Sequence, residues 1–351
     1  MTQIRMGQYG VGHGHAGSKA LAMRRNATVD FAGVYEPDPA ARARAARSGA
    51  YQGVRWLSSA EELLRDPTVQ AVAIQGFNFQ GLDMALDAAS AGKHLWYDKP
   101  AGDDWEKYNR LVALVRERGL YLQMGYMLRY QDGFQKLTEW ARSGVLGQLY
   151  LIRAHMSTYV SLDAGAQSRR MISRHRGGQL FDLGGHMLDQ ILWLMQDERP
   201  ARVTAFLRND DTPPYPAFAD NTLGVFEFSK GMAVVEIAAM EPRPIQRRFE
   251  VHGTNGSAIL DPMEAQRSIR LVLHEARGGF EAGLNDVPSA GTTRMRSHEL
   301  ELEAFVPIAL GERAPDRPLE HEILVQETLL RGVGTIRAGN DTHANGKGPV
   351  T

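Results

Sequence analysis

The chain has no cysteine among its 351 residues, which excludes disulfides, thiolate metal sites and a cysteine nucleophile. It also lacks an excess of either charge, because 40 Lys and Arg residues stand against 41 Asp and Glu residues. This balance gives no electrostatic reason to expect nucleic acid or an anionic membrane as a partner. The sequence contains no run of about 18 apolar residues, and its first residues are too polar for a signal peptide. We therefore expect a soluble, cytoplasmic protein.

Apolar periodicity in the first third of the chain predicts strands that alternate with helical segments. The predicted strands are Ile4–Tyr9, Val29–Tyr35, Val69–Ile74, Lys93–Tyr97 and Tyr121–Met124. Such alternation is typical of an α/β domain with a doubly wound parallel sheet. We predict a Rossmann dinucleotide-binding domain over residues 1–124.

The remainder of the chain has strands that follow one another in closer succession. The β-like runs are Leu149–Met156, Val203–Arg208, Thr222–Ser229, Met232–Met240 and Arg248–Gly253. This pattern predicts an α+β domain over residues 125–338, with a large, mainly antiparallel open sheet and helices on one face. Residues 339–351 are polar and rich in glycine, which predicts a flexible tail.

A glycine turn follows the first predicted strand, in the sequence YGVGHGHAG. Gly10 and Gly12 would let backbone N–H groups approach a pyrophosphate at a helix N-terminus. The third glycine of the dinucleotide motif is replaced by His15, so a purely structural turn is the alternative. Glu36 ends the second strand, where a carboxylate can accept ribose hydroxyls and repel a 2′-phosphate, although a solvated turn residue would also occupy this place. The pattern favours NAD over NADP.

Two further stretches carry candidate reactive groups. In WYDKP, Asp98 and Lys99 follow a strand at the sheet edge where ligands bind in open parallel sheets, unless Lys99 is a surface lysine at a turn. In GGQLFDLGGHMLDQILWLM, helical spacing places Asp182, His186 and Asp189 on one face. The alternative for this helix is a buried element with a hydrogen-bonded histidine.

Taken together these segments resemble the Gfo/Idh/MocA family of sugar and cyclitol oxidoreductases. The resemblance extends over nearly the whole chain and includes AGKHLWYDKP, GYMLRY after the last Rossmann strand, and the D-x-G-x-H-x-x-D helix. It implies that Lys99 is the active-site lysine, Asp182 the active-site aspartate and His186 the catalytic histidine. Two positions depart from the family pattern: Asp98 replaces a glutamate and His15 replaces a glycine.

From the motifs and this resemblance we assign residues to a cofactor site and a substrate site. The cofactor set is Gly10, Gly12, His13, His15, Glu36, Gln75, Asn78, Asp98 and Lys99. The substrate set is Tyr126, Arg129, His155, Arg176, Asp182 and His186. Arg169, Arg170 and Arg174 precede the catalytic helix with Arg176, and this cluster would bind a carboxylate, or form a solvated loop or an oligomer contact. We expect no metal site at the His13 and His15 pair, because further ligands are missing.

These assignments predict an NAD-dependent oxidoreductase that transfers a hydride between nicotinamide and a secondary alcohol of a sugar, sugar acid or cyclitol. His186 would serve as general base and Lys99 would stabilise the developing alkoxide. Two alternatives stay open: redox-neutral glycoside cleavage or elimination with retained NAD, and a non-catalytic sugar sensor. We expect a homodimer or homotetramer formed through the C-terminal sheet.

Overall fold

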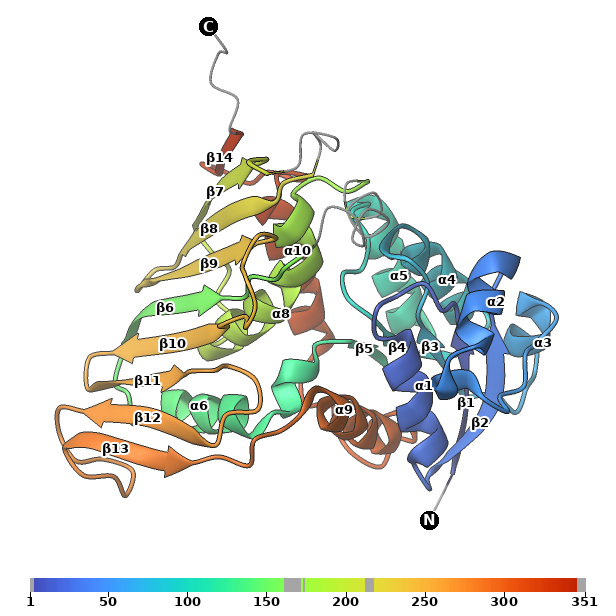
Figure 1. The fold of residues 1–351 in the computed structure, drawn as a ribbon, viewed down its shortest axis with the longest axis horizontal. Coiled ribbons are helices and arrows are strands. Elements are labelled where there is room, and N and C mark those ends of the chain that lie inside the picture. The colour runs from blue at the N-terminus through green and yellow to red at the C-terminus, as the bar shows by residue number, and fades with distance from the viewer. Residues whose placement is uncertain (1–2, 161–171, 173, 212–217, 346–351) are drawn as a thin grey trace, which may run out of the picture. The chain divides into compact units, whose positions relative to one another are not determined.

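The computed structural model describes residues 3–160, 172, 174–211 and 218–345 (Figure 1). The chain divides into two compact units. Unit 1 comprises Met1–Met127 and Met295–Glu322, and unit 2 comprises Leu128–Arg294 and Ile323–Thr351. The division differs from the two contiguous domains expected above, because Met295–Glu322 clusters with the first unit.

Unit 1 is built on a five-stranded sheet in the order β2-β1-β3-β4-β5, with every neighbouring pair parallel. The strands are β1 (Ile4–Tyr9), β2 (Val29–Tyr35), β3 (Ala71–Ile74), β4 (His94–Tyr97) and β5 (Leu122–Met124). The predicted doubly wound parallel sheet is therefore confirmed. Because the strands are parallel, their carboxyl ends lie at one edge of the sheet, and Gly10, Glu36, Gln75 and Asp98 follow four of them there.

Helices connect these strands and cover the sheet. They are α1 (Ala16–Arg25), α2 (Pro39–Ala46), η1 (Gly49–Tyr51), α3 (Ala60–Leu64), α4 (Asn78–Ser90) and α5 (Trp105–Glu117). The Asp38 side chain caps α2 by accepting a hydrogen bond from the Ala40 N–H. Ser59 likewise accepts from the Glu62 N–H at the start of α3, as its spacing from Glu62 predicts.

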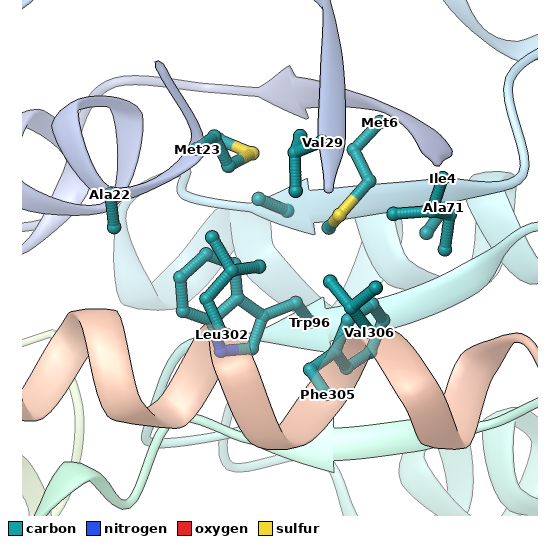
Figure 2. Close-up of a cluster of buried hydrophobic side chains, with 11 residues drawn as sticks. Ile4, Met6, Ala22, Met23, Val29, Ala71, Trp96, Leu302, Phe305 and Val306 are labelled. Carbon is teal, nitrogen blue, oxygen red and sulfur yellow. The ribbon is translucent and has the colours of Figure 1, made fainter. Parts of the chain in front are cut away.

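The core on one face of this sheet is completed by α9 (Arg294–Ala309), a helix from late in the sequence. Figure 2 shows Leu302, Phe305 and Val306 of α9 packed toward Trp96 and the strand residues. Ile4 and Met6 of β1 belong to the same buried cluster. Burying such side chains contributes roughly 1.5–3 kcal/mol each, so this packing accounts for the clustering of α9 with the Rossmann unit.

Unit 2 contains a nine-stranded sheet in the order β13-β12-β11-β10-β6-β9-β8-β7-β14. The strands are β6 (Leu149–His155), β7 (Arg202–Arg208), β8 (Asn221–Glu227), β9 (Met232–Ala238), β10 (Arg248–Gly253), β11 (Gly256–Leu260), β12 (Ser268–Leu273), β13 (Gly283–Pro288) and β14 (Thr342–Asn345). Six of the eight neighbouring pairs are antiparallel; β6 with β9 and β14 with β7 are parallel. The predicted large, mainly antiparallel open sheet is confirmed.

One face of the larger sheet is covered by helices, as Figure 1 shows. Besides α9, the described helices after β5 are η2 (Met127–Tyr130), α6 (Asp132–Arg142), α8 (Gly178–Leu194) and α10 (Leu319–Gly332). Phe134 of α6 packs edge-to-face on Phe249 of β10, with ring centroids 5.1 Å apart. In the described part of the chain, no helix is long and apolar enough to cross a membrane.

The other face carries charged residues and exposed large apolar side chains. Strand β6 shows the alternation, because Ile152 and Ala154 are buried whereas Arg153 is exposed. The exposed apolar residues on the strands are Tyr150, Phe206, Met232, Val272 and Leu284. Isolated apolar residues on a surface are common, whereas these five belong to strands of a single sheet.

The chain after Gly339 differs in part from the flexible tail predicted for residues 339–351. Residues Thr342–Asn345 form β14, which pairs in parallel with β7. Asp341 anchors this strand, because its carboxylate lies 2.7 Å from the buried Arg331 guanidinium and accepts the Val203 N–H. Residues 346–351 lie outside the described part.

Candidate active site

The glycine turn lies between β1 and α1, where it is packed against the chain that follows β3. Gly10 has a φ of 87°, and a Cβ there would lie 2.5 Å from the Gly76 nitrogen. A Cβ on Gly12 would lie 2.7 Å from the Phe77 ring. Helix α1 has neither a side-chain cap at His15 nor an acidic residue in its first turn. Its N-terminal N–H groups therefore suit an anion such as a pyrophosphate.

Glu36 links the end of β2 to this turn. Its carboxylate accepts the Val11 N–H at 2.7 Å and the Asp38 N–H at 2.8 Å. Burial raises the pKa of Glu36, while these two backbone donors oppose that shift. A carboxylate offers about four acceptor positions, so the two backbone bonds leave capacity for ribose hydroxyls.

Gln75 and Asn78 lie at the next strand end. Gln75 is completely buried directly after β3, and within the described residues neither its Oε1 nor its Nε2 has a hydrogen-bond partner. Asn78 begins α4. A buried amide without partners is rare in native structures, so Gln75 indicates a polar ligand at this edge of the sheet.

The carboxylate of Asp98, after β4, is buried among three basic groups. His15 Nδ1 lies 3.1 Å from its Oδ1, and Oδ2 lies 3.3 Å from both His13 Nδ1 and Lys19 Nζ. Burial opposes ionisation, but His13 and Lys19 outweigh it and hold the pKa of Asp98 well below its usual range. Burial in turn lowers the pKa of His15 well below 6.5, although Asp98 acts in the opposite direction. We conclude that an ionised Asp98 faces a neutral His15.

This cluster extends into α9 through residues that the sequence did not indicate. Lys19 Nζ is completely buried 3.4 Å from Glu301 Oε1 and lies 4.1 Å from the Trp96 ring centroid. His298 Nδ1 lies 3.5 Å from Glu301 Oε2. One signal was available, since Lys19 follows His15 by one helical turn on α1.

The side chains of His13, His15 and Asp98 could also be considered as ligands of a metal ion. The ligand atoms of His13, His15 and Asp98 lie within 4.8 Å of one another, a spacing that a cation could bridge. The Lys19 ammonium, however, already neutralises the single carboxylate and would repel a divalent ion. We therefore keep the prediction that this cluster serves the cofactor site rather than a metal.

Lys99 follows Asp98 and is only 3% exposed. Its backbone N–H donates to Asp98 Oδ1 at 3.0 Å. Lysine is almost never fully buried without a specific partner or role, so the surface-lysine alternative does not hold. Tyr126, which follows β5 in unit 1, is also completely buried.

Helix α8 in unit 2 carries the second group of candidates. His186 and Asp189 are buried, and Asp182, one turn before His186, is partly exposed. A Cβ on Gly184 would lie 3.3 Å from Leu329 Cδ1 of α10, so this glycine permits the two helices to approach closely. Gln179, in the first turn, is buried, and its side-chain amide has no hydrogen-bond partner among the residues described. The sequence analysis did not single out Gln179.

Arg129 contacts Asp189 rather than standing as an isolated substrate ligand. Its Nη2 lies 2.6 Å from Asp189 Oδ1, and its Nε donates to the same oxygen at 2.8 Å. This buried pair holds η2 against α8. Arg129 therefore supports the His186 helix, and its contact with a substrate stays a prediction.

His155 lies on the opposite face of the sheet from α8. It pairs with Glu236 in the β6–β9 register, whereas the buried Ala154 pairs with Val235 on the helix-covered face. Its Nδ1 lies 3.2 Å from Glu236 and its Nε2 2.8 Å from Glu241. The structure thus separates His155 from Asp182 and His186, and the period-2 alternation of β6 is the physical reason.

The arginine-rich stretch before α8 is described only in part. Arg174 and Arg176 are exposed, and the Arg176 guanidinium borders Gly334 after α10. Between them His175 is buried and stacks on Phe181, with ring centroids 4.5 Å apart. Arg169 and Arg170 lie outside the described residues.

Comparison with known proteins agrees with this arrangement. Residues 8–126 match the model for an oxidoreductase family with an NAD-binding Rossmann fold, and residues 134–259 match the GFO/IDH/MocA C-terminal domain. The chain belongs to the Gfo/Idh/MocA family. The predicted family and its two-part fold are confirmed.

Two curated relatives match this chain at below 30% identity. The uncharacterized oxidoreductase YrbE of Bacillus subtilis is 28% identical over 58% of this chain, and the match spans only 59% of YrbE. The 1,5-anhydro-D-fructose reductase of Ensifer adhaerens is 27% identical over 80% of this chain and 81% of its own length. Among solved structures, GenD2 from gentamicin A biosynthesis, in complex with NAD, has a TM-score of 0.74. It is 21% identical and covers 94% of this chain and 93% of its own, so this likeness concerns the fold.

Proposed function

We propose that the protein is an NAD-dependent dehydrogenase that acts on a secondary alcohol of a sugar, sugar acid or cyclitol. The observation that carries this proposal is the buried His186, one turn after Asp182 on a helix fixed by the Arg129–Asp189 pair. An imidazole held in a rigid, dry setting is suited to general-base catalysis, because its ordinary pKa lies near neutrality.

The residues at the carboxyl edge of the Rossmann sheet fit a dinucleotide. The uncapped N-terminus of α1 offers N–H groups to the pyrophosphate, Glu36 offers acceptors to ribose, and Gln75 offers an unpartnered buried amide. When bound, nicotinamide supplies the acceptor for a hydride. The Glu36 carboxylate would repel a 2′-phosphate, which supports NAD over NADP.

The proposed reaction converts a secondary alcohol and NAD⁺ into a ketone, NADH and a proton. His186 accepts the proton of the hydroxyl group. The hydride leaves the carbon that bears this hydroxyl group. The Lys99 ammonium stabilises the negative charge that develops on the alcohol oxygen. Asp182 binds a substrate hydroxyl or orients His186.

We also propose that the open face of the larger sheet pairs with a second copy of the chain. This face holds the exposed Tyr150, Phe206 and Met232, and an isologous contact would cover them. Its charged residues are arranged in opposite-sign pairs such as Arg248 with Glu250, which suits the polar rim of an interface.

The direct test is incubation of the protein with NAD and a panel of sugars, sugar acids and inositols. The absorbance of reduced nicotinamide should rise with at least one compound, and one NADH should form for each alcohol oxidised. Turnover of a glycoside without NADH release would instead support redox-neutral cleavage. Tight NAD binding without any turnover would support a sensor.

A further inference from the structure

A cavity of about 260 Å³ in unit 2 is lined by three arginines and a single carboxylate. Arg243 and Arg247 come from the segment between β9 and β10, and Arg294 begins α9. Glu264, after β11, is the acidic residue. None of these four residues was assigned a role above, and we call this cavity the arginine pocket.

Arg247 is built into the wall of this pocket. Its Nε donates to the Ser157 carbonyl at 3.1 Å, its Nη1 donates to Glu264 at 3.2 Å, and its side chain is only 11% exposed. Burial lowers the pKa of Arg247; Glu264 opposes this shift and the charge of Arg294 adds to it. Guanidinium has five N–H donors, so two bonds leave donors for a ligand.

The charges in the arginine pocket do not balance. Glu264 is shared, because Arg294 Nη2 also lies within 3.4 Å of it. Among the residues that the structure describes, Arg243 has no acidic group within ion-pair distance. Three guanidinium groups thus line the pocket with one carboxylate, and Glu241, outside the lining, adds a second negative charge that acts on Arg247. An anionic ligand would relieve this repulsion, and guanidinium binds carboxylate and phosphate oxygens bidentately.

The arginine pocket lies at the end of the sheet where α8 begins. Thr158, in its wall, donates through its backbone N–H to Ala238 at the end of β9, and the neighbouring Ala239 donates to Asp220. The Ala219 carbonyl accepts the Gln179 N–H in the first turn of α8. The pocket and the Asp182 end of α8 therefore border one end of one sheet.

We propose that the arginine pocket binds the anionic group, a carboxylate or a phosphate ester, of an acidic sugar whose secondary alcohol is oxidised at α8. This inference rests on the proposed function and specifies its substrate class. Hydride goes from the carbinol carbon to NAD⁺ and the hydroxyl proton goes to His186, while the anionic group stays unchanged on the arginines.

Calorimetric titration with inorganic phosphate and with D-glucuronate measures the site without any reaction. The variant Arg243→Gln removes an exposed charge that makes no ion pair with any described residue, and Arg294→Gln is a second, independent variant. Each should weaken binding of both anions about tenfold, as loss of a charged hydrogen bond predicts. Arg270→Gln removes the same charge from an exposed position on β12 and is the matched control, with unchanged binding. Equal affinities in wild type and both pocket variants would overturn the proposal, as would equal weakening in the control.

Turnover with D-glucuronate, glucose 6-phosphate and D-glucose identifies the natural anion. We expect Arg243→Gln to raise KM for the preferred acidic sugar about tenfold at unchanged kcat, so that the ratio of kcat/KM for this sugar to that for glucose falls about tenfold. If the ratio of kcat/KM for the acidic sugar to that for glucose is the same in wild type and variant, the inference is overturned. The proposed dehydrogenase activity would not be affected by that result. If phosphate binding depends on Arg243 but no sugar yields NADH, the proposed function is overturned. The proposed anion site would then still stand.

Discussion

The Arg129 guanidinium and the Asp189 carboxylate form a buried ion pair, with Nη2 2.6 Å from Oδ1 and side chains 3% and 0% exposed. This pair connects the segment that leaves the Rossmann unit to the helix that carries His186. A buried charge whose partner is removed remains unpaired in a low-dielectric interior.

Replacement of Arg129 by methionine should therefore lower the free energy of unfolding by about 3–5 kcal/mol. Urea unfolding followed by circular dichroism measures the change. The matched control is Arg116→Met, because Arg116 makes an exposed ion pair with Glu320 at 2.9 Å, and its loss should change stability by less than about 1 kcal/mol. Equal effects of the two substitutions would show that the Arg129–Asp189 pair does not stabilise the helix.

His15 should make the protein sensitive to mild acid. Its folded-state pKa lies well below 6.5, chiefly because of burial, so the unfolded chain binds a proton at this site before the folded chain does. Stability from this residue is thus present above about pH 6.5 and is lost as the pH falls below it. When the pH falls from about 7.5 to about 5.5, the free energy of unfolding of the wild type should decrease by about 1.4 kcal/mol more than that of His15→Asn.

The asparagine variant keeps an N–H donor toward Asp98 but does not titrate. Unfolding free energies at the two pH values give the comparison directly. Parallel losses in wild type and variant would contradict the buried, neutral state of His15.

Glu36 should set the preference for NAD over NADP. Its carboxylate lies at the end of β2, 2.7 Å from the Val11 nitrogen of the glycine turn. Glu36→Ser removes the charge that would repel a 2′-phosphate, so we expect the ratio of kcat/KM for NAD to that for NADP to fall about tenfold or more. The control is Glu61→Gln, which removes a carboxylate from an exposed position on α3. It should leave the ratio unchanged. An unchanged ratio in Glu36→Ser would place the ribose elsewhere.

The open sheet face predicts the oligomeric state. Phe206→Glu places a charge on β7 at an exposed apolar position, and burial of that charge between two copies would be unfavourable. Light scattering should show a dimer or tetramer for the wild type and smaller species for the variant. Arg47→Glu, exposed in unit 1, is the control with unchanged mass. A wild-type monomer at micromolar concentration would remove the basis for this proposal.

Much of the fold could be predicted from local sequence patterns. Apolar runs that mark strands, and glycines that end strands and helices, depend only on neighbouring residues. The predicted Ile4–Tyr9 and Val29–Tyr35 strands match β1 and β2 residue for residue. Helix α9 was not predicted, because its role depends on packing against a sheet formed by the first part of the chain. Its Glu301 interrupts the apolar pattern, yet that carboxylate is buried beside Lys19.

The candidate site residues likewise include some that local motifs identified and others that they could not identify. Lys99 and His186 were identified from short motifs, and both are buried, Lys99 just after β4 and His186 in the middle of α8. The Lys19–Glu301 contact spans 282 residues, so no local pattern could indicate it. His155 was selected by residue type alone, and its strand places it on the other face of the sheet.

Transfer of deuterium from substrate carbon to nicotinamide tests the central claim most directly. The protein is incubated with NAD and perdeuterated glucose, glucuronate or myo-inositol, and the cofactor is analysed by mass spectrometry. With at least one compound we expect deuterated NADH, and Lys99→Met and His186→Gln should each slow its formation at least about 100-fold while NAD binding persists. Tight NAD binding with no deuterium in the cofactor from any compound, or full transfer in both variants, would contradict the account.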